Sequence, residues 1–129
     1  MQISKLQVKI FGVRQHWSKD IKTNDISITI SNPLNLLKDE NIELYVSIDV
    51  DAIDKNFASA TGTPEPDGLM PDDAMNILRA LAPKYAITGA DMMGIAPFTD
   101  SLRQGIAGRD KTLKVVADIS EYLLKEIAK

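Results

Sequence analysis

One apolar run that ends in three acids constrains the fold of this chain more than any other stretch. It spans residues 44–54 and reads LYVSIDVDAID. Its β-branched first half is typical of a buried strand of about five or six residues. The loop that follows, residues 55–69, has no regular hydrophobic period, and loops of this length in compact domains are often functional. We therefore expect the acids to stand where a buried strand meets a functional loop.

The first two of these acids, Asp49 and Asp51, are two positions apart. In an extended chain, side chains with this spacing point to the same side. Two unpaired carboxylates repel each other and are costly to remove from water. The simplest compensation is a divalent metal ion. The alternative is a pair of solvated acids, one of them capping a turn. For Asp54, which begins the loop, a local turn bond is the expected role.

Apolar periodicity in the rest of the chain predicts strands that alternate with helices. Strands are expected at residues 6–13, 26–30 and 85–97, and helices at residues 33–40, 71–82 and 111–127. The late strand contains a break at Gly89-Ala90-Asp91, and residues 98–110 are expected to be irregular. The apolar stripe of the last helix is expected to comprise Leu113, Val116, Ala117, Ser120, Leu123, Leu124 and Ile127. This alternation favours an α/β fold with a parallel sheet, in a single domain over residues 1–129.

The clearest helix opens at Pro71, which suits the first helical position. Acids follow in the first turn, where negative charge complements the helix dipole. Its apolar stripe follows the helical period through Ala74, Ile77, Leu78 and Leu81. Pro83 marks its end, so this helix separates the acidic strand from the late strand.

Ligands of parallel α/β sheets bind beyond the carboxyl ends of the strands. Besides the three acids, two other segments stand at expected strand ends: residues 14–17, with Arg14 and His16, and residues 96–99. His16 is the only histidine of the chain. A lone histidine is more often a surface or packing residue than a ligand, so both interpretations of His16 stay open.

Composition narrows the class of protein. A net charge of −3 without a basic block argues against nucleic acid as a partner. The absence of cysteine excludes disulfides and thiolate metal sites, and is compatible with the cytoplasm. The first ten residues do not resemble a signal peptide. No apolar stretch approaches the roughly 20 residues that span a bilayer. We therefore expect a cytoplasmic protein with no membrane partner.

The run at residues 47–54, followed by Thr61-Gly62-Thr63-Pro64-Glu65 and Gly68-Leu69, closely resembles the signature of the ureohydrolases. This is the family of arginase, agmatinase and formimidoylglutamase. Residues 11–14 are similar to an earlier strand end of that family, and residues 90–97 with Asp100 to a later strand. Nearly the whole chain thus resembles the C-terminal half of a ureohydrolase, more agmatinase-like than arginase-like. The resemblance implies a three-layer α/β/α fold with a mainly parallel sheet, about half of the arginase-like fold.

The resemblance also implies a chemistry. Asp49 and Asp51 match the last two metal-ligand aspartates of the family, which hold a binuclear manganese pair. Carboxylates suit Mn²⁺. Two metal ions that share a water can lower its pKa and direct it at a guanidinium carbon, which releases urea and an amine. The implied ligand is a small guanidino substrate. The candidate substrate-binding residues are Arg14, His16, Asp54 and Thr61.

Two departures from the family pattern limit this chemistry. The family's other four ligands lie upstream, in a G-G-D-H and a D-A-H-x-D segment, and this chain has neither. Asp49 and Asp51 alone would hold a metal weakly. The family's substrate-contacting glutamate falls at Gly94, which offers no carboxylate to a guanidinium. We therefore expect a chain that does not catalyse alone, either a fragment or one member of a split pair.

Half of a fold leaves a sheet edge exposed, and exposed edges pair. We therefore expect a homo-oligomer or a partner chain that carries the missing N-terminal half. The competing hypothesis is a non-catalytic binding or assembly module, which Gly94 favours. A phosphorylation receiver domain is disfavoured because Gly12-Val13-Arg14 replaces its acidic pair and Ala96 replaces its lysine. A complete hydrolase in this chain alone is equally disfavoured.

Overall fold

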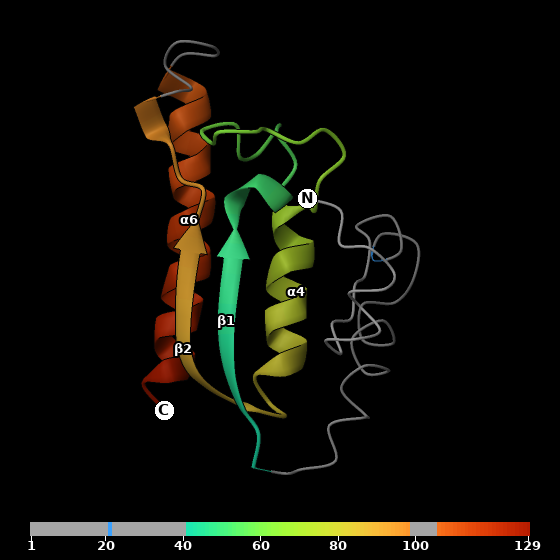
Figure 1. Cartoon of the computed structure of the whole chain (residues 1–129), viewed down its shortest axis with the longest axis vertical. Coiled ribbons are helices and arrows are strands. Elements are labelled where there is room, and N and C mark those ends of the chain that lie inside the picture. The colour runs from blue at the N-terminus through green and yellow to red at the C-terminus, as the bar shows by residue number, and fades with distance from the viewer. Residues whose placement is uncertain (1–20, 22–40, 99–105) are drawn as a thin grey trace, which may run out of the picture.

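The structure, a computed structural model, describes Ile21 and residues 41–98 and 106–129. The described elements are strand β1 (Glu43–Asp49), the short 3-10 helix η1 (Val50–Ala52), helix α4 (Pro71–Leu81), strand β2 (Ala86–Met93) and helix α6 (Ile106–Ile127). The strands are parallel neighbours, and α4 lies between them in the chain (Figure 1). The predicted α/β class with a parallel sheet is therefore confirmed. The elements predicted at residues 6–13, 26–30 and 33–40 lie outside the described residues.

The two strands pair so that Tyr45 lies opposite Gly89, Ser47 opposite Asp91 and Asp49 opposite Met93. Leu44 pairs with Ile87, so the register shifts by one residue at Thr88. The break predicted at residues 89–91 is wrong, because β2 runs through all three residues. Packing explains the difference: a Cβ on Gly89 would lie 2.8 Å from the Tyr45 ring, so the glycine makes room for a cross-strand side chain.

The two faces of the sheet differ. Val46 and Ile48 of β1, with Ala90 and Met92 of β2, pack against the buried core. This core draws on both helices as well as on β2 and the turn after β1. Its members are Val50, Ile53, Ala58, Ala74, Leu78, Ile87, Ile119 and Leu123. Both helices thus cover the same face, and the described residues form two of the three predicted layers. Burying each large side chain stabilises the fold by about 1.5–3 kcal/mol.

Helix α4 follows its sequence pattern. Pro71 occupies the first turn, and the Asp73 carboxylate accepts a hydrogen bond from the Met70 backbone N–H at 3.3 Å. Ala74 and Leu78 are buried, as the apolar stripe predicted. The helix ends at Leu81, before Pro83. Neither helix in the described ranges is both long enough and apolar enough to cross a membrane.

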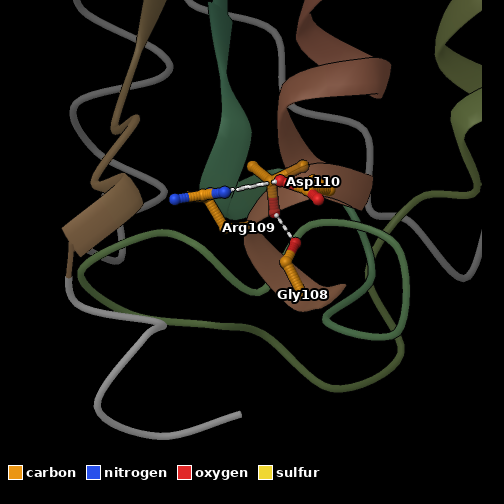
Figure 2. A network of polar contacts seen from close by, with 4 residues as sticks. Gly108, Arg109 and Asp110 are labelled. Atoms are coloured by element: carbon orange, nitrogen blue, oxygen red, sulfur yellow. Dashed lines mark hydrogen bonds and ion pairs between the residues drawn. The ribbon is translucent and has the colours of Figure 1, made fainter. Parts of the chain in front are cut away.

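Helix α6 differs from its prediction in two ways. It begins at Ile106 rather than near residue 111, so part of the segment expected to be irregular is helical. Figure 2 shows Gly108 in this first part, beside the ion pair between Arg109 and Asp110. The buried residues are Gly108, Thr112, Ile119 and Leu123. Of the predicted stripe, Leu113, Ala117, Leu124 and Ile127 are exposed in the described structure.

The hydroxyl of Thr112 makes two hydrogen bonds on the buried face of α6. It donates to the Gly108 carbonyl and accepts from the Ala60 backbone N–H, both at 3.0 Å. The bond from Ala60 joins the Thr112 side of the helix to the loop, although threonine did not belong to the predicted apolar stripe. The buried face of α6 therefore combines a polar tertiary contact at Thr112 with the apolar residues Ile119 and Leu123.

Candidate functional site

The two acids stand where β1 ends. Asp49 is the last residue of the strand, and Asp51 belongs to η1. Asp49 Oδ1 accepts a hydrogen bond from the Asp51 backbone N–H at 3.1 Å, so Asp49 caps the short helix. The expectation of an extended chain through both acids is wrong at Asp51. The chain turns there because the Asp49 carboxylate competes for a backbone donor, as aspartate commonly does.

The two carboxylates nevertheless approach one small space, next to Gly94. This glycine directly follows β2, whose last residue pairs with Asp49. A Cβ on Gly94 would lie 2.7 Å from Asp49 Oδ1 and 3.0 Å from Asp51 Oδ1. One point near the glycine is thus within 3.0 Å of an oxygen from each acid. The turn after β1 therefore brings the two carboxylates together, which an extended chain was expected to do.

Only one of the two oxygens of the Asp51 carboxylate has a hydrogen-bond partner among the described residues. Its Oδ2 accepts a hydrogen bond from the Thr63 hydroxyl. Its Oδ1 is inaccessible to solvent and, within the described ranges, has no hydrogen-bond partner. Leaving a buried charged oxygen without a partner is costly. This oxygen needs a proton donor or a cation, and it lies at the space beside Gly94.

The loop at residues 55–69 is held near the acids by contacts with the segment after β2 and with α6. Ala96 N–H donates to the Ala60 carbonyl at 2.8 Å, next to a bridge between Thr61 and Ile95. The Thr112 hydroxyl accepts from Ala60 N–H at 3.0 Å. The loop is therefore tied to the segment after β2 and to α6, which keeps Thr63 against Asp51. Neither Thr63 nor Thr112 was predicted from the sequence as a site residue, although Thr63 lies within the G-T-P run.

The base of the loop closes on itself through the backbone. Asp54 N–H donates to the Leu69 carbonyl at 2.9 Å, and Leu69 N–H donates to the Ala52 carbonyl at 2.8 Å. Gly68 packs so tightly that a Cβ there would lie 2.6 Å from the Asp54 nitrogen. The Asp54 carboxylate is buried and accepts from Asn56 N–H at 2.9 Å. This is the local turn bond expected of an aspartate that begins a loop.

A second polar group, Tyr45, Ser47 and Asp91, lies on the exposed face of the sheet. The Asp91 carboxylate accepts from the Ser47 hydroxyl at 2.6 Å and from the Tyr45 hydroxyl at 3.0 Å. The hydrogen bond to Asp91 raises the pKa of Tyr45 above 10.0, with smaller effects of burial and of the Asp91 charge. Asp91 is thus held by two hydroxyl donors from the neighbouring strand.

The predicted site residues lie in different surroundings in the structure. It brings Asp49 and Asp51 together, and it places Asp54 in a buried turn. Thr61 is 0% exposed, and its hydroxyl oxygen accepts from Thr63 N–H at 3.4 Å. Its predicted contact with a substrate stays a prediction, as does that of Asp54. Arg14 and His16 lie outside the described residues.

The described residues fit part of a metal site. They contain no group of three or more histidine, cysteine, aspartate or glutamate side chains placed to hold a metal ion. Asp49 and Asp51 do offer two hard oxygen donors at one space, and one of these oxygens is buried without a partner. Oxygen donors of this kind suit Mn²⁺ or Mg²⁺. The pair thus matches two ligands of a divalent cation.

The described elements define an α/β protein with an acidic site at the carboxyl end of its parallel sheet. A profile described as "Arginase family" matches residues 3–124. The chain belongs to the arginase family. The predicted resemblance to the ureohydrolases is therefore confirmed.

Individual relatives support the same assignment. Agmatinase from Bacillus anthracis is 31% identical over 99 residues, which are 70% of this chain and 34% of the relative. Agmatinase from Proteus mirabilis is 40% identical over 60 residues, which are 46% of this chain and 19% of the relative.

Among solved structures, proclavaminate amidino hydrolase from Streptomyces clavuligerus matches 99% of this chain with a TM-score of 0.75 and 26% identity. Agmatine ureohydrolase of Thermoplasma volcanium matches 85% with a TM-score of 0.57 and 30% identity. This chain covers 39% and 31% of those two proteins. It thus spans well under half the length of the relatives it matches.

Proposed function

We propose that Asp49 and Asp51 are two ligands of a binuclear manganese site and that this chain contributes to hydrolysis of a guanidino or amidino C–N bond. One observation carries the proposal: both carboxylates approach the space beside Gly94, where Asp51 Oδ1 is buried without a partner. A divalent cation would satisfy that oxygen and offset the repulsion between the acids. The membership of the arginase family supports the choice of reaction.

The residues of this chain would act mainly by holding the ligands in place. When bound, the metal pair supplies a polarised water at neutral pH. Asp49 is oriented by the Asp51 backbone N–H, and Asp51 by the Thr63 hydroxyl. This orientation matters because the groups that hydrogen-bond to metal ligands tune the geometry of the site and its affinity for the metal. We retain Arg14, His16, Asp54 and Thr61 as candidate substrate-binding residues. For the buried Asp54 and Thr61, the described geometry favours support of the loop.

We propose that the remaining ligands come from a second chain. Two carboxylates make a weak site because affinity grows with the number of preorganised donors. The chain has one histidine and spans 34% of the agmatinase from Bacillus anthracis. The partner would be a second copy of this chain or a chain that carries the N-terminal half of the family fold. We also propose a cytoplasmic location, since a chain without cysteine needs no oxidising compartment.

Calorimetric titration with Mn²⁺ tests the ligand assignment. The full chain is compared with an Asp49→Ala/Asp51→Ala variant and with Asp110→Ala/Asp118→Ala as a control of equal charge change. The control acids form exposed ion pairs on α6, where such pairs contribute little to stability. We expect binding in the wild type and the control, and its loss in the site variant. Equal binding in all three would contradict the assignment.

Release of urea or ammonia from agmatine, arginine and formimidoylglutamate tests the reaction. We expect Mn²⁺-dependent release only after a chain carrying the N-terminal half of the family fold is added. The second candidate function is a non-catalytic binding or assembly module. It is favoured by Gly94, which places no carboxylate beside the acid pair. That candidate predicts no release under any condition, even where Mn²⁺ binds.

A further inference from the structure

We infer that the outward face of α6 is the surface on which a second copy of this chain docks, helix against helix and in antiparallel orientation. In naming the partner and the surface of contact, we deepen the proposed function, on which the expectation of a partner chain rests. Neither Asp49 nor Asp51 belongs to this surface. The docking surface and the metal site can therefore be tested separately.

Helix α6 carries apolar and small side chains on two of its faces. One face is buried against the core. On the other face, Leu113 is 40% exposed and Leu124 is 66% exposed. We call this second face the outer stripe, and its members are Leu113, Ala117, Ser120, Leu124 and Ile127. Large apolar side chains that gather on one exposed face mark an interaction surface. Figure 1 shows α6 along the side of the described structure away from α4, where a partner can approach its whole length.

The spacing of the outer stripe indicates what kind of partner fits it. From Leu113 to Ile127, its members follow one another at intervals of four, three, four and three positions. This is the heptad spacing by which two helices pack along their length, each side chain inserting between side chains of the other helix. The outer stripe therefore fits a second helix, and a second copy of α6 offers the same spacing.

Two charged residues on one flank of the stripe favour an antiparallel pair. Lys114 and Glu121 each directly follow a member of the stripe. In an antiparallel pair of identical helices, Lys114 faces Glu121 of the partner subunit, and the two-fold symmetry repeats this contact. In a parallel pair, Lys114 would instead lie level with the partner's Lys114. Charge complementarity of α6 with itself therefore selects the antiparallel orientation.

Both flanking charges are available for a contact with a second copy. The side chains of Lys114 and Glu121 are 74% and 67% exposed. Lys114 pairs with Asp118, and Glu121 with Lys125, one turn along the same helix. Such exposed pairs contribute little to stability. Rearranging them to face a partner therefore costs little.

The sizes of the side chains suit the same orientation. Leu113 would pack against Leu124 of the partner subunit, and Ala117 against Ser120 of the partner subunit. The leucines thus form both ends of the contact, and the small residues in the middle let the helices approach closely. A hollow of about 190 Å³ lies between α6 and β2 and is lined in part by Ser120, Leu124 and Ile127. The partner's Leu113 can insert there.

Sedimentation equilibrium of the full chain, without added metal, tests the docking surface. We expect a wild-type mass of twice the 14.2 kDa of one chain. Leu113→Gln should raise the dissociation constant of the dimer by about tenfold or more, because the symmetry removes two leucine contacts at once. Met70→Gln is the matched control, since Met70 is also 40% exposed but lies outside α6, and it should dimerise like the wild type. Circular dichroism verifies that both variants are folded. A wild type that is monomeric at all concentrations, or equal dissociation constants for the two variants, would overturn the inference.

Charge reversal tests the antiparallel orientation. Lys114→Glu and Glu121→Lys each place like charges across the contact, and each should raise the dissociation constant by about tenfold at low salt. The double variant Lys114→Glu/Glu121→Lys restores opposite charges and should dimerise like the wild type. Lys125→Glu makes the same change of charge away from the stripe and is the control. A double variant as weak as the single variants, or equal effects of Lys114→Glu and Lys125→Glu, would overturn the antiparallel docking.

The outcomes distinguish this inference from the proposed function. A metal-free dimer that is lost in Leu113→Gln supports the docking surface, even if calorimetry finds no Mn²⁺ binding and the metal site is thereby rejected. A wild type that binds Mn²⁺ but stays monomeric would overturn the docking surface and leave Asp49 and Asp51 as ligands. If a chain carrying the N-terminal half of the family fold binds a monomeric wild type and not Leu113→Gln, that chain covers the outer stripe and the inference is overturned.

Discussion

The Tyr45 hydroxyl donates a hydrogen bond to Asp91 Oδ2 at 3.0 Å, from one strand of the sheet to the next. The ring reaches across Gly89, where a Cβ would lie 2.8 Å from it. Ser47 donates to the other oxygen of the same carboxylate at 2.6 Å. The three side chains thus tie β1 to β2 on the exposed face of the sheet, and Ser47 lies two residues before Asp49.

This contact makes stability depend on pH in the alkaline range. The hydrogen bond to Asp91 raises the pKa of Tyr45 above 10.0, because ionisation of the phenol would remove the donor. The protonated phenol is therefore favoured in the folded state, and its contribution to stability is fully present below pH 10.0. That contribution is lost as the pH rises through the raised pKa. We expect a phenolate absorbance titration to place the midpoint of Tyr45 above 10.0.

The difference between wild type and Tyr45→Phe isolates Tyr45 in this titration. In Asp91→Ala, which removes the acceptor of that hydrogen bond, the midpoint should fall toward 10.0. A wild-type midpoint at or below that value would show that the contact with Asp91 does not govern the titration of Tyr45.

Thr112→Val should destabilise the fold by about 1–3 kcal/mol, because it leaves the buried Ala60 N–H without an acceptor. Thr112→Ser keeps the hydroxyl and should retain most of the stability. Urea denaturation monitored by circular dichroism measures both free energies of unfolding. If the valine variant were as stable as the serine variant, the hydroxyl would not be what holds the loop to α6.

Gly68→Ala should lower the free energy of unfolding by about 1–3 kcal/mol, the usual range for overpacking. A Cβ at this position would lie 2.6–2.8 Å from backbone atoms of Ala52, Ile53 and Asp54, which cannot move aside as a side chain can. Gly62→Ala, where nothing lies within 4 Å, is the matched control and should change stability by less than about 1 kcal/mol. Thermal unfolding of the two variants gives the comparison, and equal midpoints would argue against the tight closure at Gly68.

Thr63→Val should weaken Mn²⁺ binding by about tenfold, because it removes the hydroxyl that holds the Asp51 carboxylate. Thr63→Ser retains that hydroxyl and should bind with nearly wild-type affinity. Calorimetry on the full chain measures both, and circular dichroism verifies the fold. Equal affinities of the valine and serine variants would mean that Asp51 needs no orienting partner.

Local sequence patterns predicted several elements and failed at particular residues. Pro71 and the apolar stripe of α4 predicted a helix that the structure contains, since capping and periodicity act within a few turns of chain. Gly89 suggested a break in β2, yet the strand continues because Tyr45 packs over the glycine. The buried face of α6 was also mispredicted in part: it includes Ile119 and Thr112, and the hydrogen bond that Thr112 accepts from a distant loop has no signal in apolar spacing.

The sequence by itself determined the parallel α/β class, the strand that ends at Asp49, the pair of acids and the membership of the arginase family. The class, the strand and the acid pair follow from periodicity and from the spacing of residues close together in the chain, and the family follows from the resemblance of its motifs. Only the tertiary structure decided that Asp51 lies in a short helix, that Thr63 holds it, and that Gly94 lies beside both acids. Such contacts join residues far apart in the chain, and the packing of β2 and the long loop against β1 brings them together.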